Sequence, residues 1–318
     1  MPSLSAEAMT SQTTLAMAPQ TVANRWAERL TNLVKEHGHL YLLLNRFNGL
    51  DERLQPLVDT LPEQWPLTDP YFGEAIERAP LLVKLTMAQL PLLDQAALVA
   101  AEEALDPAMP SPSVCAWMCA GVSTERLAGQ LRRQLDIRLE GRKKSVFFRY
   151  FDPGVMSHLP RVFTPAQLAR LLGHMSLWVA PGRDGALLEL TKPEDEMAPA
   201  GLRLSAEQAQ ALERIDPING LLKMLGGLGH TIAPSHDHEL DALVLLAQQK
   251  GHATEADILS YGLHALLISR NFDRLPEVKQ AIQSAQAQGL GLGEALDGFD
   301  DAFWAANAAE LASLRPST

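Results

Sequence analysis

Cysteine is scarce in this sequence, and long apolar runs are missing. The 318 residues include two cysteines, Cys115 and Cys119. So few thiols exclude a disulfide framework and favour a reducing compartment. No apolar run approaches the roughly 18 residues that a membrane-spanning helix requires, so we expect no membrane segment and no membrane partner. The two cysteines fall in an apolar stretch, where we expect a strand with both thiols on the same buried face.

The common catalytic signatures are also missing. The sequence contains no Gly-x-Ser-x-Gly elbow, no His-Glu-x-x-His zinc motif and no phosphate loop ending in Lys-Ser/Thr. Residues 1–20 are rich in Ser, Thr and Ala and lack the basic and apolar parts of a signal peptide, so we expect a disordered tail. These features predict a cytoplasmic protein without a catalytic constellation.

Acidic residues outnumber basic ones, and the imbalance lies in the second half. The chain has 27 Lys/Arg and 38 Asp/Glu, a net charge of −11. From Thr191 onward there are 9 Lys/Arg and 18 Asp/Glu, a balance of −9, which leaves −2 for the first 190 residues. This step, with the Pro-rich and acidic composition of residues 191–203, predicts a linker between two domains. Because the protein is acidic, we expect no nucleic-acid partner.

The periodicity differs between these two halves. Residues 21–190 alternate strand-like and helix-like segments, which predicts an α/β domain with a mixed sheet and flanking helices. Residues 204–318 carry helical patterns throughout, which predicts an all-α domain with the apolar helix 255–269 at its centre. The expected strands of the first domain cover residues 40–47, 81–85, 113–120, 174–180 and 187–190.

The most informative stretch is KKSVFFRYFDPGVM, residues 143–156. Residues 146–151 alternate with aromatic side chains on both faces, which predicts a central strand covered on both sides. Together with residues 135–139 they predict a β-hairpin. Asp152 and Pro153 suit the N-cap and the first position of a helix. Arg149 and Asp152 form either part of a partner-binding surface or an ion pair at this corner, whose disruption would cost about 3 kcal/mol if fully buried.

The segment FFRYFDPGVM, followed by LPRVFTPAQLARLLGHMSLWV, resembles the core of the type VI secretion effector-chaperone (adaptor) family. That family carries an Arg-aromatic-aromatic-Asp-Pro motif after a charged hairpin, then a short helix pair and a strand containing Trp. The resemblance covers roughly residues 40–184. The matching residues in this chain are Arg149, Tyr150, Phe151, Asp152, Pro153 and Trp178.

The resemblance implies a function in protein binding, by a protein that is not an enzyme and that binds no cofactor. It implies an adaptor that binds a toxic effector, its cargo, in the cytoplasm and promotes loading of that effector onto the VgrG spike protein. A co-chaperone is a further candidate partner. A groove between the two domains would hold the cargo, and the acidic helical domain would select it. The partner-binding or structural candidates are Arg149, Tyr150, Asp152, Pro153, Trp178, Arg138, Arg142 and Lys143.

Two further clusters leave alternatives open. Basic residues surround the hairpin and form a patch for an acidic partner or a solvated surface; a nucleic-acid surface is the least favoured alternative, since no stacking aromatics alternate with these charges. These basic residues are Arg132, Arg133, Arg138, Arg142, Lys143 and Lys144. His230, His236 and His238 are the best metal-like group, although neighbouring residues also suit the start of a helix. A metal-dependent hydrolase that uses these histidines is therefore a competing function. An immunity protein that binds a toxin is a separate alternative.

Overall fold

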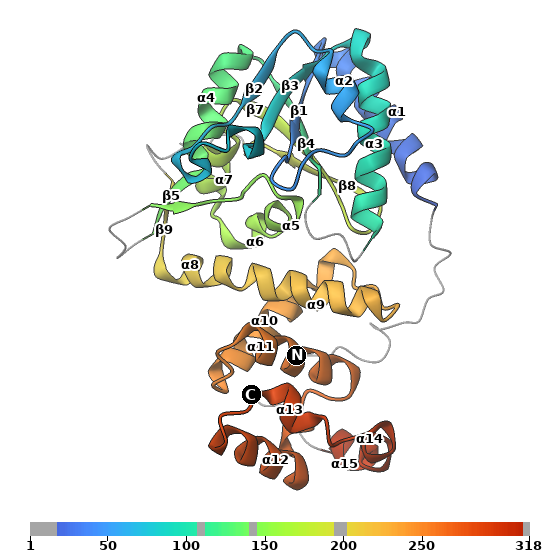
Figure 1. The fold of residues 1–318 in the computed structure, drawn as a ribbon, viewed down its shortest axis with the longest axis vertical. Helices are drawn as coiled ribbons and strands as arrows, with labels where there is room; N and C mark the ends of the chain where they lie inside the picture. The colour runs from blue at the N-terminus through green and yellow to red at the C-terminus, as the bar shows by residue number, and fades with distance from the viewer. Residues whose placement is uncertain (1–17, 107–111, 140–144, 194–201, 314–318) are drawn as a thin grey trace. The chain divides into compact units, whose positions relative to one another are not determined.

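The structure, a computed structural model, describes residues 18–106, 112–139, 145–193 and 202–313. The chain divides into two compact units, one ending at Leu212 and the other beginning at Glu213; Figure 1 shows the elements of each. Most of the predicted linker 191–203 lies outside the described residues, as does the predicted tail up to residue 17. Residues 19 and 20 already belong to helix α1 (Pro19–His37), which ends at Gly38 in the left-handed conformation that glycine favours.

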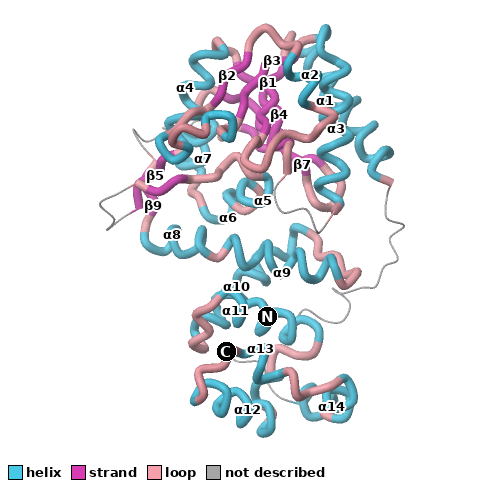
Figure 2. Tube along the Cα trace, viewed as in Figure 1, coloured by secondary structure: helices cyan, strands magenta, loops and turns pink. Residues whose placement is uncertain are grey.

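A six-stranded sheet forms the middle of the first unit (Figures 1 and 2). Its strand order is β2-β3-β1-β4-β7-β8. Every neighbouring pair in it is antiparallel. The inner strands β1 and β4 are buried along their whole length, so both faces of the sheet are covered. The strands are β1 (Leu40–Leu44), β2 (Gln64–Pro66), β3 (Leu81–Leu85), β4 (Val114–Ala120), β7 (Met175–Pro181) and β8 (Leu187–Thr191).

Alternate residues of β1 serve two different cores. Leu40, Leu42 and Leu44 pack with α1 and with α3 (Leu90–Leu105). Tyr41 and Leu43 pack on the other face, with α4 (Thr124–Gln134) and α7 (Pro165–Leu172). The period of two along a pleated strand explains this division. The fold class predicted for the first domain, a mixed sheet with flanking helices, is confirmed, although the large sheet is antiparallel throughout and the parallel pairing lies in a second, smaller sheet.

The two cysteines lie on opposite faces of β4, so the prediction that they share a face is wrong. Ala116 lies opposite Leu43 of β1 and Val114 lies opposite Leu44, so the register shifts by one residue between them. Cys115 is the extra residue at this bulge and packs on the α4 side of the sheet, whereas Cys119 packs on the α1 side. A bulge interrupts the alternation of side chains along a strand.

A second sheet of three strands contains the predicted hairpin. β5 (Asp136–Leu139) pairs antiparallel with β6 (Val146–Phe147) and parallel with β9 (Arg203–Leu204). The hairpin is therefore confirmed, but the central strand predicted over residues 146–151 is wrong. β6 has two residues and forms an edge of this small sheet. The chain then leaves the sheet, and the aromatic residues that follow enter the core without strand pairing.

Short helices complete the first unit. Thr164 and Gln167 form the predicted capping box at the start of α7. Helix α8 also packs against the core of this unit, and Gln208 on it donates to the carbonyl of Val162 at 2.8 Å. The first unit therefore extends past the predicted linker. The short elements are α2 (Gln55–Asp59), η1 (Pro70–Phe72), η2 (Ile76–Arg78), η3 (Met87–Gln89), α5 (Pro153–Met156), α6 (Leu159–Val162) and α8 (Ala206–Glu213).

The second unit is helical throughout the part that the structure describes, as predicted. Tyr261 on α11 and Phe272 are fully buried at its core. Thr254 caps α11 by accepting a hydrogen bond from the backbone N–H of Asp257 at 3.1 Å. The helices are α9 (Ile215–Gly227), η4 (Pro234–His236), α10 (Asp237–Gln249), α11 (Glu255–Leu267), η5 (Phe272–Arg274), α12 (Pro276–Ala287), α13 (Leu292–Leu296), α14 (Asp301–Ala306) and α15 (Ala308–Ser313).

Candidate functional site

Asp152 and Pro153 start helix α5 as the sequence predicts. One carboxylate oxygen of Asp152 accepts a hydrogen bond from the backbone N–H of Gly154 at 2.9 Å, and Pro153 occupies the first helical turn. The other oxygen accepts from the Arg149 guanidinium at 2.7 Å. The Arg149 side chain is 44% exposed. The pair therefore lies at the surface, where an ion pair contributes about 1 kcal/mol or less, and it is not the fully buried pair considered from the sequence.

Tyr150 and Trp178 lie in the core of the first unit. Both side chains are fully buried, and their ring centroids are 6.1 Å apart. The Tyr150 hydroxyl donates to the carbonyl of Leu131 near the end of α4 at 2.9 Å, and burial raises the pKa of this phenol well above its usual value. These two residues of the motif are positioned to hold α4 against the sheet, and neither reaches the surface.

The basic cluster is only partly described by the structure. Arg142, Lys143 and Lys144 lie outside the described residues. Arg138 is exposed on β5, between two buried neighbours whose side chains point to the other face. Arg132 and Arg133 are exposed near the end of α4.

The three histidines of the metal hypothesis do not form a metal centre. His236 and His238 each bond to Ser235, through the hydroxyl at 3.3 Å and the carbonyl at 3.0 Å respectively. No group of three or more His, Cys, Asp or Glu side chains in the described residues could hold a metal ion. The structure therefore does not bring His230, His236 and His238 together as ligands.

An exposed aromatic surface adjoins the Arg149 corner. The rings of Tyr71 and Phe147 stack face to face, with centroids 4.1 Å apart and planes 5° apart. Arg78 lies over the ring of Phe47 at 4.3 Å and donates to the Phe47 carbonyl at 3.0 Å. Arg149 lines the same small pocket, of about 30 Å³. We call these five residues, Phe47, Tyr71, Arg78, Phe147 and Arg149, the aromatic surface.

The aromatic surface is held from beneath by the core. Phe72 packs edge-on against Tyr71 and Phe147, with ring centroids 5.5 and 5.4 Å away, and is itself buried. Tyr71 is 57% exposed. The composition of this surface, aromatic rings and arginines, is typical of protein interfaces.

The sequence contained only weak signs of this surface. Tyr71 falls in a segment rich in proline and aromatic residues, and Phe147 falls in the alternating stretch after the hairpin. Nothing in the local pattern indicates that residues 71 and 147 touch, because their contact depends on how η1 packs against β6.

Comparison with known protein families gives a match to part of the first unit. No helix of the described residues has the length and apolar character to cross a membrane. No curated protein and no solved structure matches the chain significantly. A family match does exist, and it begins with β1, contains both the Arg149 corner and the aromatic surface, and stops within α7. Residues 40–170 match the family described as a domain of unknown function, DUF4123.

Proposed function

We propose that this protein is an adaptor of type VI secretion, which binds a cognate effector in the cytoplasm and promotes its loading onto the VgrG spike protein. The proposal rests first on the resemblance of the Arg149–Pro153 motif, its helix pair and the Trp178 strand to the adaptor family. The family match over residues 40–170 covers the motif and the helices that follow it. The observation that carries the proposal is the exposed Tyr71–Phe147 stack beside Arg149.

An ordered aromatic surface is suited to reversible protein binding. Burial of apolar area is favourable, so Tyr71, a residue that remains 57% exposed in the folded chain, can be stabilised further by a partner. Tyrosine and arginine are enriched among the residues that dominate binding energy. The Tyr71 ring is already fixed by its stack on Phe147, so little side-chain entropy is lost on binding. Such binding needs no turnover and no cofactor.

The test is binding to the effector encoded beside a spike gene in the same genome. Tyr71→Ala should weaken this complex by about thirty-fold, the loss expected for a central interface residue. Met87→Ala is the matched control, because Met87 is a large apolar residue of the same unit, 46% exposed, that does not line the pocket at the aromatic surface. Equal effects of the two variants, or no complex with any such effector, would refute the proposal.

The same complex separates an adaptor from an immunity protein. An adaptor should bind the effector after its toxic domain has been deleted and should form a ternary complex with VgrG. An immunity protein requires the toxic domain. Loss of the gene should abolish delivery of the effector while the cell still produces it.

Selection of the particular cargo is assigned to the acidic second unit. The family match ends before this unit begins, so this unit is the first candidate for contacts that are particular to one cargo. A chain that ends at Leu212 should therefore lose preference for its own effector. Unchanged affinity and preference in that shortened chain would contradict this assignment.

A further inference from the structure

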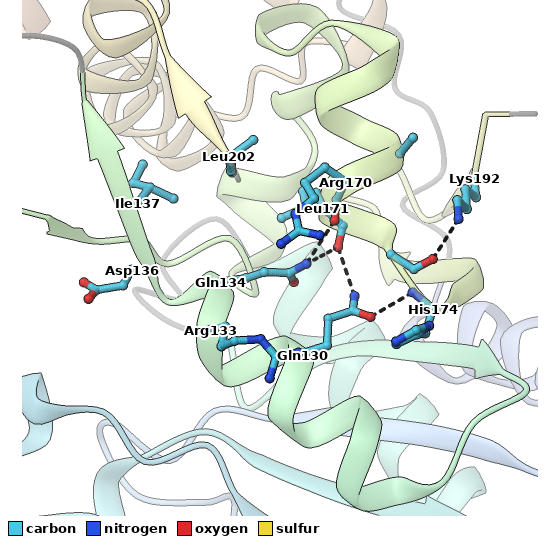
Figure 3. A pocket seen from close by; sticks show the side chains of 12 residues that line it. Gln130, Arg133, Gln134, Asp136, Ile137, Arg170, Leu171, His174, Lys192 and Leu202 are labelled. Atoms are coloured by element: carbon cyan, nitrogen blue, oxygen red, sulfur yellow. Dashed lines mark hydrogen bonds between the residues drawn. The ribbon is translucent and has the colours of Figure 1, made fainter. Parts of the chain in front are cut away.

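A cavity of about 530 Å³ opens between α4, α7 and β5 (Figure 3). It lies in the first unit, and its volume falls within the range typical of ligand sites, about 300 to 1,000 Å³. Helix α4 contributes Arg133, α7 contributes Arg170, β5 contributes Asp136 and Ile137, and Lys192 follows β8.

The wall of this cavity is ordered by two glutamine side chains of α4. Gln130 is buried; its amide nitrogen donates to the carbonyl of Leu172 at 3.0 Å, and its oxygen accepts from the backbone N–H of His174 at 2.8 Å. Gln134 donates to the carbonyl of Leu171 at 2.6 Å. Figure 3 shows these bonds joining α4 to the end of α7. Hydrogen bonds between α4 and the segment that ends α7 therefore hold this wall of the cavity in place.

Positive charge dominates the cavity lining. Three cationic side chains, Arg133, Arg170 and Lys192, line it together with one carboxylate, Asp136. In the part of the chain that the structure describes, none of the three cations forms a salt bridge. Lys192 donates to the carbonyl of Gly173 at 3.0 Å, and Figure 3 places Asp136 on the side away from it.

The neighbouring histidine responds to this charge. The guanidinium of Arg126 lies 3.2 Å from the ring of His174. Burial, together with the nearby Arg126, Lys192 and Arg133, lowers the pKa of His174. Cations that outnumber carboxylates three to one, and that form no ion pair with another described residue, make a site where an anion is favoured.

We infer that this cavity binds an acidic peptide segment of a partner polypeptide, with Asp or Glu carboxylates paired to Arg133, Arg170 and Lys192. Leu202, which is only partly buried, belongs to the same lining and suits an aliphatic part of such a segment. A phosphate ion alone would leave this side chain uncovered. Among the lining residues there is no Phe, Tyr or Trp on which a base could stack, so nucleic acid is the poorer fit.

The identity of the partner rests on the proposed function, since the segment is assigned to the effector or to the spike. Binding itself can be measured without either. The probe is a capped octapeptide of alternating Glu and Leu, titrated into the full-length protein by calorimetry at low ionic strength. Wild-type protein should bind it, and affinity should fall as salt is added. The same peptide with Gln in place of Glu should not bind measurably.

Charge-removing variants locate the site. Arg133→Gln and Arg170→Gln should each weaken binding by about five-fold, as loss of one partly exposed ion pair predicts. Arg132→Gln removes the same charge from the adjacent residue of α4, which does not line the cavity, and should have no more than a minor effect. All three arginines are exposed, so the variants should fold normally.

His174 supplies an independent readout. A bound carboxylate should raise the imidazole pKa of His174 in an NMR titration, because it offsets the surrounding positive charge. The inference is overturned if wild type does not bind the Glu peptide, if Arg132→Gln weakens binding as much as Arg133→Gln, or if inorganic phosphate or a single-stranded oligonucleotide binds more tightly than the peptide.

The two proposals fail in different ways. If the peptide binds as expected but no effector forms a complex that depends on Tyr71, the adaptor function fails and the anion site stands. If effector binding depends on Tyr71 but neither the peptide nor the arginine variants show an effect, the cavity is not a binding site and the adaptor function stands.

Discussion

Replacing Tyr150 with phenylalanine removes one hydroxyl group from the core of the first unit. That hydroxyl donates to the carbonyl of Leu131, whose expected helical donor, the N–H of Leu135, bonds to the carbonyl of Arg132 instead. Without Tyr150 the Leu131 carbonyl loses its side-chain donor in a buried place, at a cost of about 1 to 2 kcal/mol. For a unit of this size, Tm should fall by about 2 to 8 °C.

Substitutions at the exposed residues of the motif should lower the stability by different amounts, less at Arg149 than at Asp152. Arg149→Ala removes an exposed ion pair and should cost at most about 1 kcal/mol. Asp152→Ala removes that pair and also the N-cap of α5, and should cost about 1 to 2 kcal/mol. Urea unfolding followed by tryptophan fluorescence measures each value, in a Trp304→Phe background that leaves tryptophan in the first unit alone.

Two results would refute this reasoning. A loss of about 3 kcal/mol from Arg149→Ala would show that the pair behaves as a buried one. An unchanged free energy of unfolding for Tyr150→Phe would show that the hydroxyl contributes nothing to the end of α4. If instead the order holds, the arginine of the motif is not needed for folding, and its effect on effector binding can be measured in a stable protein.

Three further outcomes are expected. Burial lowers the pKa of His252, whereas an unfolded histidine titrates near about 6.5. The unfolded chain therefore binds more protons, and the stability of the second unit should fall as pH drops below that value. His252→Phe should flatten the dependence of Tm on pH, and an unchanged slope would contradict this. A chain that stops at residue 190 lacks Leu204, which is 1% exposed, and its first unit should be less stable than that of a chain ending at Glu213 by at least about 2 kcal/mol in urea unfolding; equal stability would show that β9 and α8 are dispensable. Gly262→Ala places a methyl group 2.6 Å from Leu221 and should lower the free energy of unfolding by about 1 to 3 kcal/mol. Gly129→Ala, on α4, has its nearest neighbour 3.5 Å away and should raise that free energy by about 0.5 to 1 kcal/mol. Thermal unfolding of both variants tests this difference.

Local sequence patterns predicted most strands of the first sheet and two helix N-caps of the same unit. β3 was predicted at its observed bounds, and β1, β4, β7 and β8 within a few residues. The Asp152 N-cap and the Thr164 capping box were also predicted, because both depend on side chains bonding to backbone groups two or three residues away.

Features that depend on contacts between distant segments could not be predicted in this way. The aromatic residues after Phe147 looked like a central strand, although they are buried by packing under α4 and α7 and not by pairing in the large sheet. The two-residue strand β9 carries too little pattern to be recognised, and its partner β5 lies about 65 residues earlier. The cations of the α4–α7 cavity likewise come from three separate segments, namely α4, α7 and the residue after β8.

The opposite placement of the two cysteines has a practical consequence for labelling. Both thiols are buried, and burial raises the pKa of Cys115 well above its ordinary value and that of Cys119 to about 11. Neither is a reactive thiolate at neutral pH, so a maleimide should react with them only when β4 separates from its neighbours. A single cysteine introduced at an exposed position can therefore carry a fluorophore without removal of the native pair, and the slow modification of Cys115 and Cys119 reports how often each side of the sheet opens.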